Sequence, residues 1–174
     1  MGKVIKVLVT GPFNAGKTEF IRTISDIPIV STEQPISDSF KSVKDETTVA
    51  MDYGQVKIDG DMFHLYGTPG QSRFDFMWDI LSKEMHVFIL MVDSCDRGTF
   101  SGARRLLRIL RRKSRRVPYL VVANKQDMDK ALSVQEMSKA LKLESRTPIW
   151  PCIATDKASA RKVLDAGLKP LVGL

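Results

Sequence analysis

Two short runs of the sequence are apolar without interruption: "VFILMV" (Val87 to Val92) and "YLVVA" (Tyr119 to Ala123). Strands have this composition when both faces of their sheet are covered, as in parallel sheets flanked by helices. The longer run is far too short to cross a bilayer as a helix. A chain with two such strands must therefore place its sheet between two covering layers.

Further strand-like and helix-like segments alternate along the chain, and the Asp59-Gly60 pair is typical of a tight turn between two strands. This order predicts an α/β protein with three layers: a mostly parallel six-stranded sheet with one antiparallel edge strand, and helices on both faces. The 174 residues contain no repeat or linker, so we expect a single domain, residues 1–174. Strands are predicted at residues 3–10, 48–58, 61–68, 86–93, 117–124 and 149–153, and helices at 17–25, 98–113, 133–141 and 157–171.

The positive charge of the chain is concentrated in one segment. The net charge is +7, and "RRLLRILRRKSRR" (Arg104 to Arg116) contains eight basic residues and no acidic one, which leaves −1 for the remainder. Leucines at helical spacing predict a helix with a core-facing stripe and a separate basic face. Such a face is either simply solvated or binds an anionic partner. A partner would be an anionic membrane or an acidic protein, and not nucleic acid, because no recognition motif or interleaved aromatic residues accompany the charge.

The two cysteines, Cys95 and Cys152, lie far apart in sequence, each next to a predicted strand. We expect reduced core residues and neither a disulfide nor a metal site. The first ten residues alternate like a strand and resemble no signal peptide, and the last five contain no cysteine for prenylation. These features predict a cytoplasmic protein, peripheral at the membrane if the basic helix binds lipid.

A phosphate-binding motif lies between the first predicted strand and the first helix. "GPFNAGKT" (Gly11 to Thr18) fits G-x-x-x-x-G-K-[ST], in which the glycines let backbone amides face the phosphate oxygens. The following helix adds its dipole, the lysine supplies a charge for the β- and γ-phosphates, and the threonine hydroxyl suits Mg²⁺. The predicted nucleotide-binding residues of this segment are Gly11, Asn14, Ala15, Gly16, Lys17, Thr18 and Glu19.

A second motif, "NKQD" (Asn124 to Asp127), directly follows an apolar strand, at the strand end where α/β sheets bind ligands. The carboxylate of Asp127 can accept two hydrogen bonds from the N1–H and N2–H₂ edge of guanine, whereas adenine offers no such pair of donors. Together with the upstream phosphate motif, this segment predicts that the bound base is guanine.

With these motifs, the chain resembles the Ras-like small GTPases over nearly its whole length. The resemblance implies the P-loop NTPase fold, GTP and GDP as ligands, Mg²⁺ as cofactor, and regulatory and effector proteins as partners. The variant "GTPGQSRF" (Gly67 to Phe74) is most similar to bacterial and archaeal small GTPases, including those near the gliding-motility GTPases. The matching segments are "GPFNAGKT", "TTVAMDYG", "TPGQ", "NKQD" and, more weakly, "ATDK".

The resemblance also implies roles on the base side of the site. Asn124 would contact the guanine and brace the P-loop, and Lys125 would lie along the base and ribose. Ala154 and Thr155 stand in the place of the family's Ser-Ala-Lys loop, where Thr155 would help to present a backbone amide to the guanine oxygen.

On the γ-phosphate side, the resemblance implies that Thr48 binds Mg²⁺ together with Thr18 in the GTP state. Only the similarity of "TVAMDYG" to the T-I-G-V-D-F-G of Rab proteins favours Thr48 over its neighbour Thr47. Gly70 would place its amide on the γ-phosphate. Gln71 would orient the attacking water and, with Lys17, carry the catalysis.

Three departures from the family pattern bear on hydrolysis. The Asp of Asp-x-x-Gly, which holds Mg²⁺ through water, is replaced by Gly67, with Tyr66 before it. Phe13 stands where side chains in Ras obstruct an incoming arginine, unless it merely packs outward. The predicted first switch loop, residues 28–48, contains no arginine. We therefore expect Mg²⁺ to be bound with few carboxylates, and intrinsic hydrolysis to be slow and assisted by a partner.

The sequence therefore predicts a guanine-nucleotide switch that binds GTP and GDP and slowly hydrolyses GTP. The alternative is a guanine-nucleotide-binding scaffold with little or no hydrolysis. A metabolic P-loop kinase is disfavoured, because "NKQD" and "TPGQ" have no reason to occur together in one.

Overall fold

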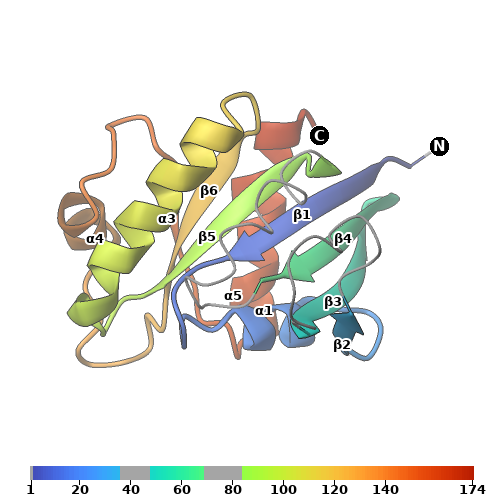
Figure 1. The fold of residues 1–174 in the computed structure, drawn as a ribbon, viewed down its shortest axis with the longest axis horizontal. Coiled ribbons are helices and arrows are strands. Elements are labelled where there is room, and N and C mark those ends of the chain that lie inside the picture. The colour runs from blue at the N-terminus through green and yellow to red at the C-terminus, as the bar shows by residue number, and fades with distance from the viewer. Residues whose placement is uncertain (1, 36–47, 69–83) are drawn as a thin grey trace.

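The computed structural model describes residues 2–35, 48–68 and 84–174 of the chain (Figure 1). Gly70 and Gln71, two of the predicted site residues, lie outside the described residues, as does Thr47. The structure describes Thr48 through its backbone, at the start of a strand opposite Pro35.

In the described part of the chain, seven strands form one sheet, in the spatial order β2-β3-β4-β1-β5-β6-β7. Strand β1 pairs in parallel with β4 and β5, and β5, β6 and β7 continue in parallel. Strand β3 runs antiparallel to both of its neighbours, β2 and β4. The bounds are β1 (Val4–Thr10), β2 (Val30–Pro35), β3 (Thr48–Ile58), β4 (Asp61–Gly67), β5 (Val87–Asp93), β6 (Tyr119–Asn124) and β7 (Ile149–Pro151).

The predicted fold class is confirmed, but the sheet has seven strands where the sequence predicts six. The additional strand, β2, lies at the edge of the sheet. The antiparallel strand β3 is therefore not the edge strand that the sequence predicts, because it pairs with a strand on each side. The sequence "VSTEQP" contains a single aliphatic residue, Val30, which is exposed. Such a polar edge strand has no hydrophobic alternation from which a sequence pattern could predict it.

The helices cover both faces of the sheet. Helices α1 and α5 lie on one face and α3 on the other (Figure 1). The bounds are α1 (Lys17–Ile24), α3 (Phe100–Lys113), α4 (Val134–Ala140) and α5 (Lys157–Lys162), and the last continues as a π-helical segment (Val163–Leu168) and a 3₁₀ turn (Lys169–Val172). All four helical segments predicted from the sequence are present, with ends that differ by a few residues.

Two buried layers fix the helices to the sheet. On one face, Phe20 and Ile24 of α1 and Leu164 of the last helix pack against β1 and β4. On the other face, Phe100 and Ala103 of α3 pack against β5 and β6. Every residue of β5 is buried, which explains the uninterrupted apolar run in its sequence.

Local sequence determines several element ends. Ser133 caps α4 and forms a reciprocal capping box with Glu136, because each side chain accepts the backbone N–H of the other residue. Asp59 and Gly60 have φ of 51° and 92°, and this left-handed pair makes the predicted tight turn between β3 and β4.

The sheet brings the two sequence motifs together. Because β1, β5 and β6 are parallel, their carboxyl ends meet at one edge, and Asp93 of β5 lies opposite Asn124 of β6. The P-loop follows β1 at this same edge, so the phosphate motif and "NKQD" adjoin each other although they are more than a hundred residues apart in sequence.

Candidate nucleotide-binding site

The loop between β1 and α1 requires glycine at two positions. Gly11 has φ of 150°, and a Cβ there would lie 2.1 Å from the carbonyl oxygen of Met91. Gly16 has φ of 97°, and a Cβ there would lie 2.2 Å from Nδ2 of Asn124. A side chain would therefore collide with the backbone of β5 at the first position and displace the Asn124 amide at the second. Asn14, at φ 62°, adds another left-handed residue to the turn.

Lys17, the first residue of α1, is buried inside this loop. Its Nζ donates to the carbonyl oxygens of Gly11, at 2.9 Å, and Pro12, at 2.8 Å. Burial lowers the pKa of Lys17 to about 8, while the nearby charge of Asp52 acts to raise it. An anion bound in the loop would favour the charged form of this amine.

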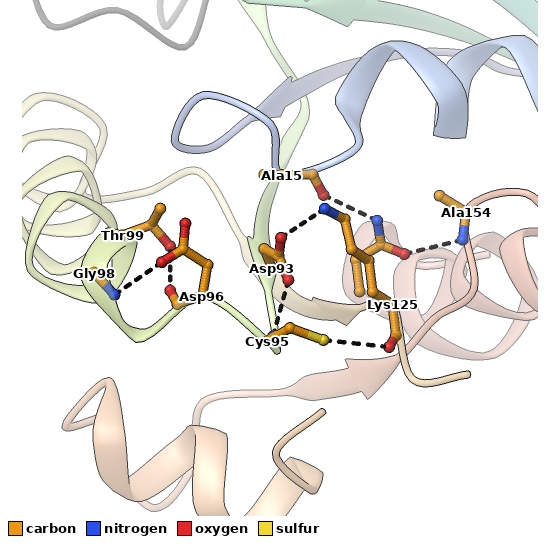
Figure 2. Close-up of polar contacts among 9 residues, drawn as sticks. Ala15, Asp93, Cys95, Asp96, Gly98, Thr99, Lys125 and Ala154 are labelled. Atoms are coloured by element: carbon orange, nitrogen blue, oxygen red, sulfur yellow. Dashed lines mark hydrogen bonds and ion pairs between the residues drawn. The ribbon is translucent and has the colours of Figure 1, made fainter. Parts of the chain in front are cut away.

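Asn124 connects three segments of the site. Its Nδ2 donates to the carbonyl oxygen of Ala15, and its Oδ1 accepts from the backbone N–H of Ala154, both at 2.9 Å. Figure 2 labels Ala15 and Ala154, the partners in these two hydrogen bonds. Because Asn124 is almost wholly buried, its two hydrogen bonds are shielded from water, and they fix the P-loop relative to the loop after β7.

Lys125, which follows, has a left-handed backbone with φ of 65°. Its Nζ forms an ion pair of 2.6 Å with Oδ2 of Asp93, whose Oδ1 accepts from the backbone N–H of Cys95 at 2.8 Å (Figure 2). Asp93 is buried and was not predicted as a site residue. Its position at the carboxyl end of an apolar strand is the sequence signal that could have identified it.

The next residue, Gln126, fixes the loop that also contains Asp127. Nε2 of Gln126 donates to Oγ of Ser94, at 2.8 Å, and to the carbonyl oxygen of Leu132, at 2.9 Å. Asp127 is exposed, so its carboxylate is accessible to a ligand. Thr155 is also exposed, next to the buried Ala154 whose amide binds Asn124.

On the opposite side of the P-loop, Thr18 contacts a carboxylate that the sequence analysis did not predict. Its hydroxyl donates to Oδ2 of Asp52, a residue in the middle of β3. Glu19, predicted to bind nucleotide, forms an ion pair through its carboxylate with Arg22 one turn along α1. Phe13 is 73% exposed, so its ring packs against none of the described core.

The residues at this position fit Mg²⁺. A hydroxyl and a carboxylate are hard oxygen donors, and Mg²⁺ binds through one or two such groups together with phosphates and water. Over residues 2–35, 48–68 and 84–174, the structure contains no cluster of three or more His, Cys, Asp or Glu residues that could hold a metal ion by themselves. Both cysteines are free, but only Cys152 is a core residue as predicted, since Cys95 is half-buried outside the core. Burial raises the pKa of the Cys152 thiol to about 12.

The fold and the site together define a class of protein. A P-loop between β1 and α1, braced by the asparagine of "NKQD" at the carboxyl ends of a mostly parallel sheet, is the arrangement of Ras-like P-loop GTPases. The chain belongs to the ADP-ribosylation factor (Arf) family, whose sequence pattern matches residues 1–173. It is an Arf-family GTP-binding small GTPase, consistent with a nucleotide-dependent switch.

Relatives occur in archaea and eukaryotes. An uncharacterized protein of Methanocaldococcus jannaschii is 32% identical over 124 residues, which are 71% of each chain. ADP-ribosylation factor-like protein 6 of Danio rerio is 29% identical over 168 residues, or 94% of this chain and 84% of that protein. The Arl6 small GTPase of Trypanosoma brucei, solved with a nucleotide analogue, matches in fold with a TM-score of 0.77 and 18% identity, covering 98% of both chains.

The described part of the chain contains no helix that is both long enough and apolar enough to span a membrane.

Proposed function

We propose that this protein is a single-domain GTP/GDP switch that binds guanine nucleotide with Mg²⁺ and hydrolyses GTP slowly, assisted by a partner. The observation that carries the proposal is the pair of hydrogen bonds that Asn124 makes, donating to Ala15 and accepting from Ala154, which joins the phosphate loop to the base loops. Such a brace preorganises both ends of a nucleotide site before the ligand arrives.

Most of the residues predicted from the sequence have a stated role in this proposal. Gly11 and Gly16 give the loop the conformation in which its backbone amides bind the phosphates, and Lys17 supplies a positive charge. The guanine is bound by the remaining base-side residues, with Asp127 as the group that distinguishes it from adenine. The residues assigned to the base are Asn124, Lys125, Asp127, Ala154 and Thr155, and those assigned to the γ-phosphate and the ion are Thr18, Thr48, Gly70 and Gln71.

Mg²⁺, when bound, supplies charge neutralisation at the β- and γ-phosphates. Intrinsic hydrolysis is slow in this proposal because the first switch loop contains no arginine to stabilise the charge of the transferring phosphoryl group. A partner protein supplies that charge. The lineage is a prokaryotic branch with the "TPGQ" second switch, near the gliding-motility GTPases; the archaeal relative supports the prokaryotic part of this placement.

Nucleotide identification by chromatography of the purified protein, followed by single-turnover hydrolysis, tests the proposal. We expect GDP or GTP in the purified protein, slow Mg²⁺-dependent turnover, and roughly 10-fold or greater slowing by Gln71→Ala. Rapid hydrolysis without any partner would contradict the need for assistance. No turnover in wild type, with nucleotide still bound, would favour the scaffold alternative.

The basic helix α3 carries a second part of the proposal, binding at an anionic membrane. Its arginines line a groove of about 700 Å³ between α3 and the end of α4. Inside the groove, the hydroxyl of Ser114 is buried and has no hydrogen-bond partner among the described residues. The groove is lined by the basic residues Arg104, Arg108, Arg111, Arg112, Arg115 and Lys142, and also by Leu107 and Tyr119.

Sedimentation with anionic liposomes at two salt concentrations tests this part. We expect binding that falls steeply with salt and is lost in the triple variant Arg108→Glu, Arg112→Glu, Arg115→Glu. The matched control reverses three exposed lysines elsewhere and should bind like wild type: Lys130→Glu, Lys139→Glu and Lys157→Glu. Equal loss in both variants would show a net-charge effect, and no sedimentation of wild type would leave an acidic protein as the partner.

A further inference from the structure

Strand β4 offers no carboxylate to the ion position beside Thr18. Gly67 has no side chain, and Thr68 is buried with its hydroxyl donating to Oγ1 of Thr10 at 3.1 Å. The ring of Tyr66 packs on Tyr53, with centroids 5.3 Å apart. Since side chains alternate along a strand, this aromatic pair lies on the opposite face from residue 67.

The adjacent strand brings a carboxylate to the same place. Asp52 of β3 lies directly opposite Gly67 in the antiparallel register, and a Cβ at Gly67 would be 3.2 Å from the Cβ of Asp52. That Cβ would also lie 2.8 Å from Cδ1 of Ile21 in α1. The pair therefore faces α1, whose first turn contains Thr18.

Two hydroxyl groups fix the orientation of the Asp52 carboxylate. Oδ2 accepts from Oγ1 of Thr18, and Oδ1 accepts from Oγ of Ser31 in β2 at 2.7 Å. The charge of Asp52 also acts on Lys17, whose pKa it raises against the effect of burial. The carboxylate is therefore close to both P-loop side chains that the proposed function assigns to phosphate and metal.

We propose that Asp52 replaces the missing acid of the second switch and holds Thr18 in position for Mg²⁺. This inference rests on the proposed function. Because the Thr18 hydroxyl donates its hydrogen bond to Asp52, the lone pairs of its oxygen remain free to face the ion. The carboxylate also adds negative charge near the ion. Because Gly67 has no side chain, the space beside it is available to Asp52 of the neighbouring strand. Asp52 is a positioning residue that acts through Thr18.

The experiment measures dissociation of fluorescent GDP from the full chain over a series of Mg²⁺ concentrations and in excess chelator. Asp52→Asn keeps the size and one acceptor oxygen but removes the charge. Ser31→Ala removes the hydroxyl contact from β2 to Asp52 but leaves the charge of Asp52, its contact with Thr18 and the backbone pairing of β2 with β3 in place, so it shows the effect of losing that contact alone. Asp26→Asn is the matched control, since it neutralises an exposed carboxylate that also accepts from β3, at the backbone N–H of Lys57, beyond the far end of α1.

We expect Asp52→Asn to raise the Mg²⁺ concentration for half-maximal slowing of GDP release roughly 10-fold, with the rate in chelator unchanged. Ser31→Ala and Asp26→Asn should stay within about twofold of wild type. A Mg²⁺ dependence of Asp52→Asn equal to that of Asp26→Asn would overturn the inference. So would an equal acceleration of release with and without Mg²⁺.

Asp52→Ser provides a second uncharged variant, with circular dichroism as the check of folding for both; whichever variant folds decides the outcome by the same criterion. If wild type retains no guanine nucleotide at any Mg²⁺ concentration, the proposed function itself fails. That result is distinct from a wild type that responds to Mg²⁺ while the Asp52 variants respond identically.

Discussion

Asn124 and Asp52 both connect the P-loop region to a strand of the sheet, but they use different chemistry. Asn124 is buried and neutral, and its amide satisfies a carbonyl and an N–H on either side of it. Asp52 is half-buried and charged, and it contacts two hydroxyl groups and lies near Lys17. The contacts of Asn124 on the base side are therefore neutral hydrogen bonds, whereas Asp52 acts beside Thr18, on the metal side, as a charged group.

This difference predicts different sensitivities. Neutral hydrogen bonds between buried groups depend little on salt, pH or metal, whereas a half-buried carboxylate and a lysine with a lowered pKa respond to all three. We expect the base side to be the permanent part of the site and the metal side to be the part that can be regulated.

The largest effect is expected from Asn124→Ala, which breaks the base side. The change leaves the Ala15 carbonyl and the Ala154 N–H unpaired, at a cost of about 2–4 kcal/mol in the free energy of unfolding. GDP affinity should fall more than roughly 100-fold, measured by fluorescence titration.

Gln126→Ala is the matched control for this variant. It also removes two hydrogen bonds beside the same strand end, to Ser94 and Leu132, but neither reaches the P-loop. A similar loss of stability with less than about a 10-fold loss of affinity is expected. Equal losses of affinity in both variants would remove the special role of the brace.

A smaller effect is expected from pH, and it tests the charged side. The pKa of Lys17 is about 8 in the ligand-free protein, and bound phosphate favours the protonated amine. Above that pH the free protein must take up a proton on binding, so GDP affinity should fall roughly 10-fold between about pH 7 and about pH 9. Lys17→Gln, whose side chain cannot titrate, should bind GDP weakly and lack this fall of affinity with pH. An identical pH profile in both proteins would contradict the role of Lys17 as the titrating group.

The smallest effect is expected from Asp93→Asn, which weakens the ion pair of Asp93 with Lys125 on the base side. Because Lys125 is partly exposed, solvent screens part of the interaction, and we expect about a threefold loss of GDP affinity. Glu84→Gln, in an exposed pair with Lys6, is the control and should leave affinity unchanged. A loss as large as that of Asn124→Ala would show that the base side also depends on charge.

Local motifs predicted the parts of the fold and site that depend on neighbours in sequence. The apolar runs gave β5 and β6, and "GPFNAGKT" with "NKQD" gave two loops that the structure places at one edge of the sheet. Asp52 could not be predicted this way, because its position depends on the register between β3 and β4. The polar edge strand β2 was missed because backbone pairing leaves no hydrophobic pattern.

The base selectivity of Asp127 is the most direct test of the central claim, that this chain is a guanine-nucleotide switch. Fluorescent GDP bound in Mg²⁺ would be displaced by unlabelled GDP, GTP or ADP, in wild type and in Asp127→Ala. We expect GDP and GTP to displace it at concentrations at least roughly 100-fold below that of ADP, and Asp127→Ala to lose most of this difference. Displacement by ADP as effective as by GDP in wild type would contradict the account.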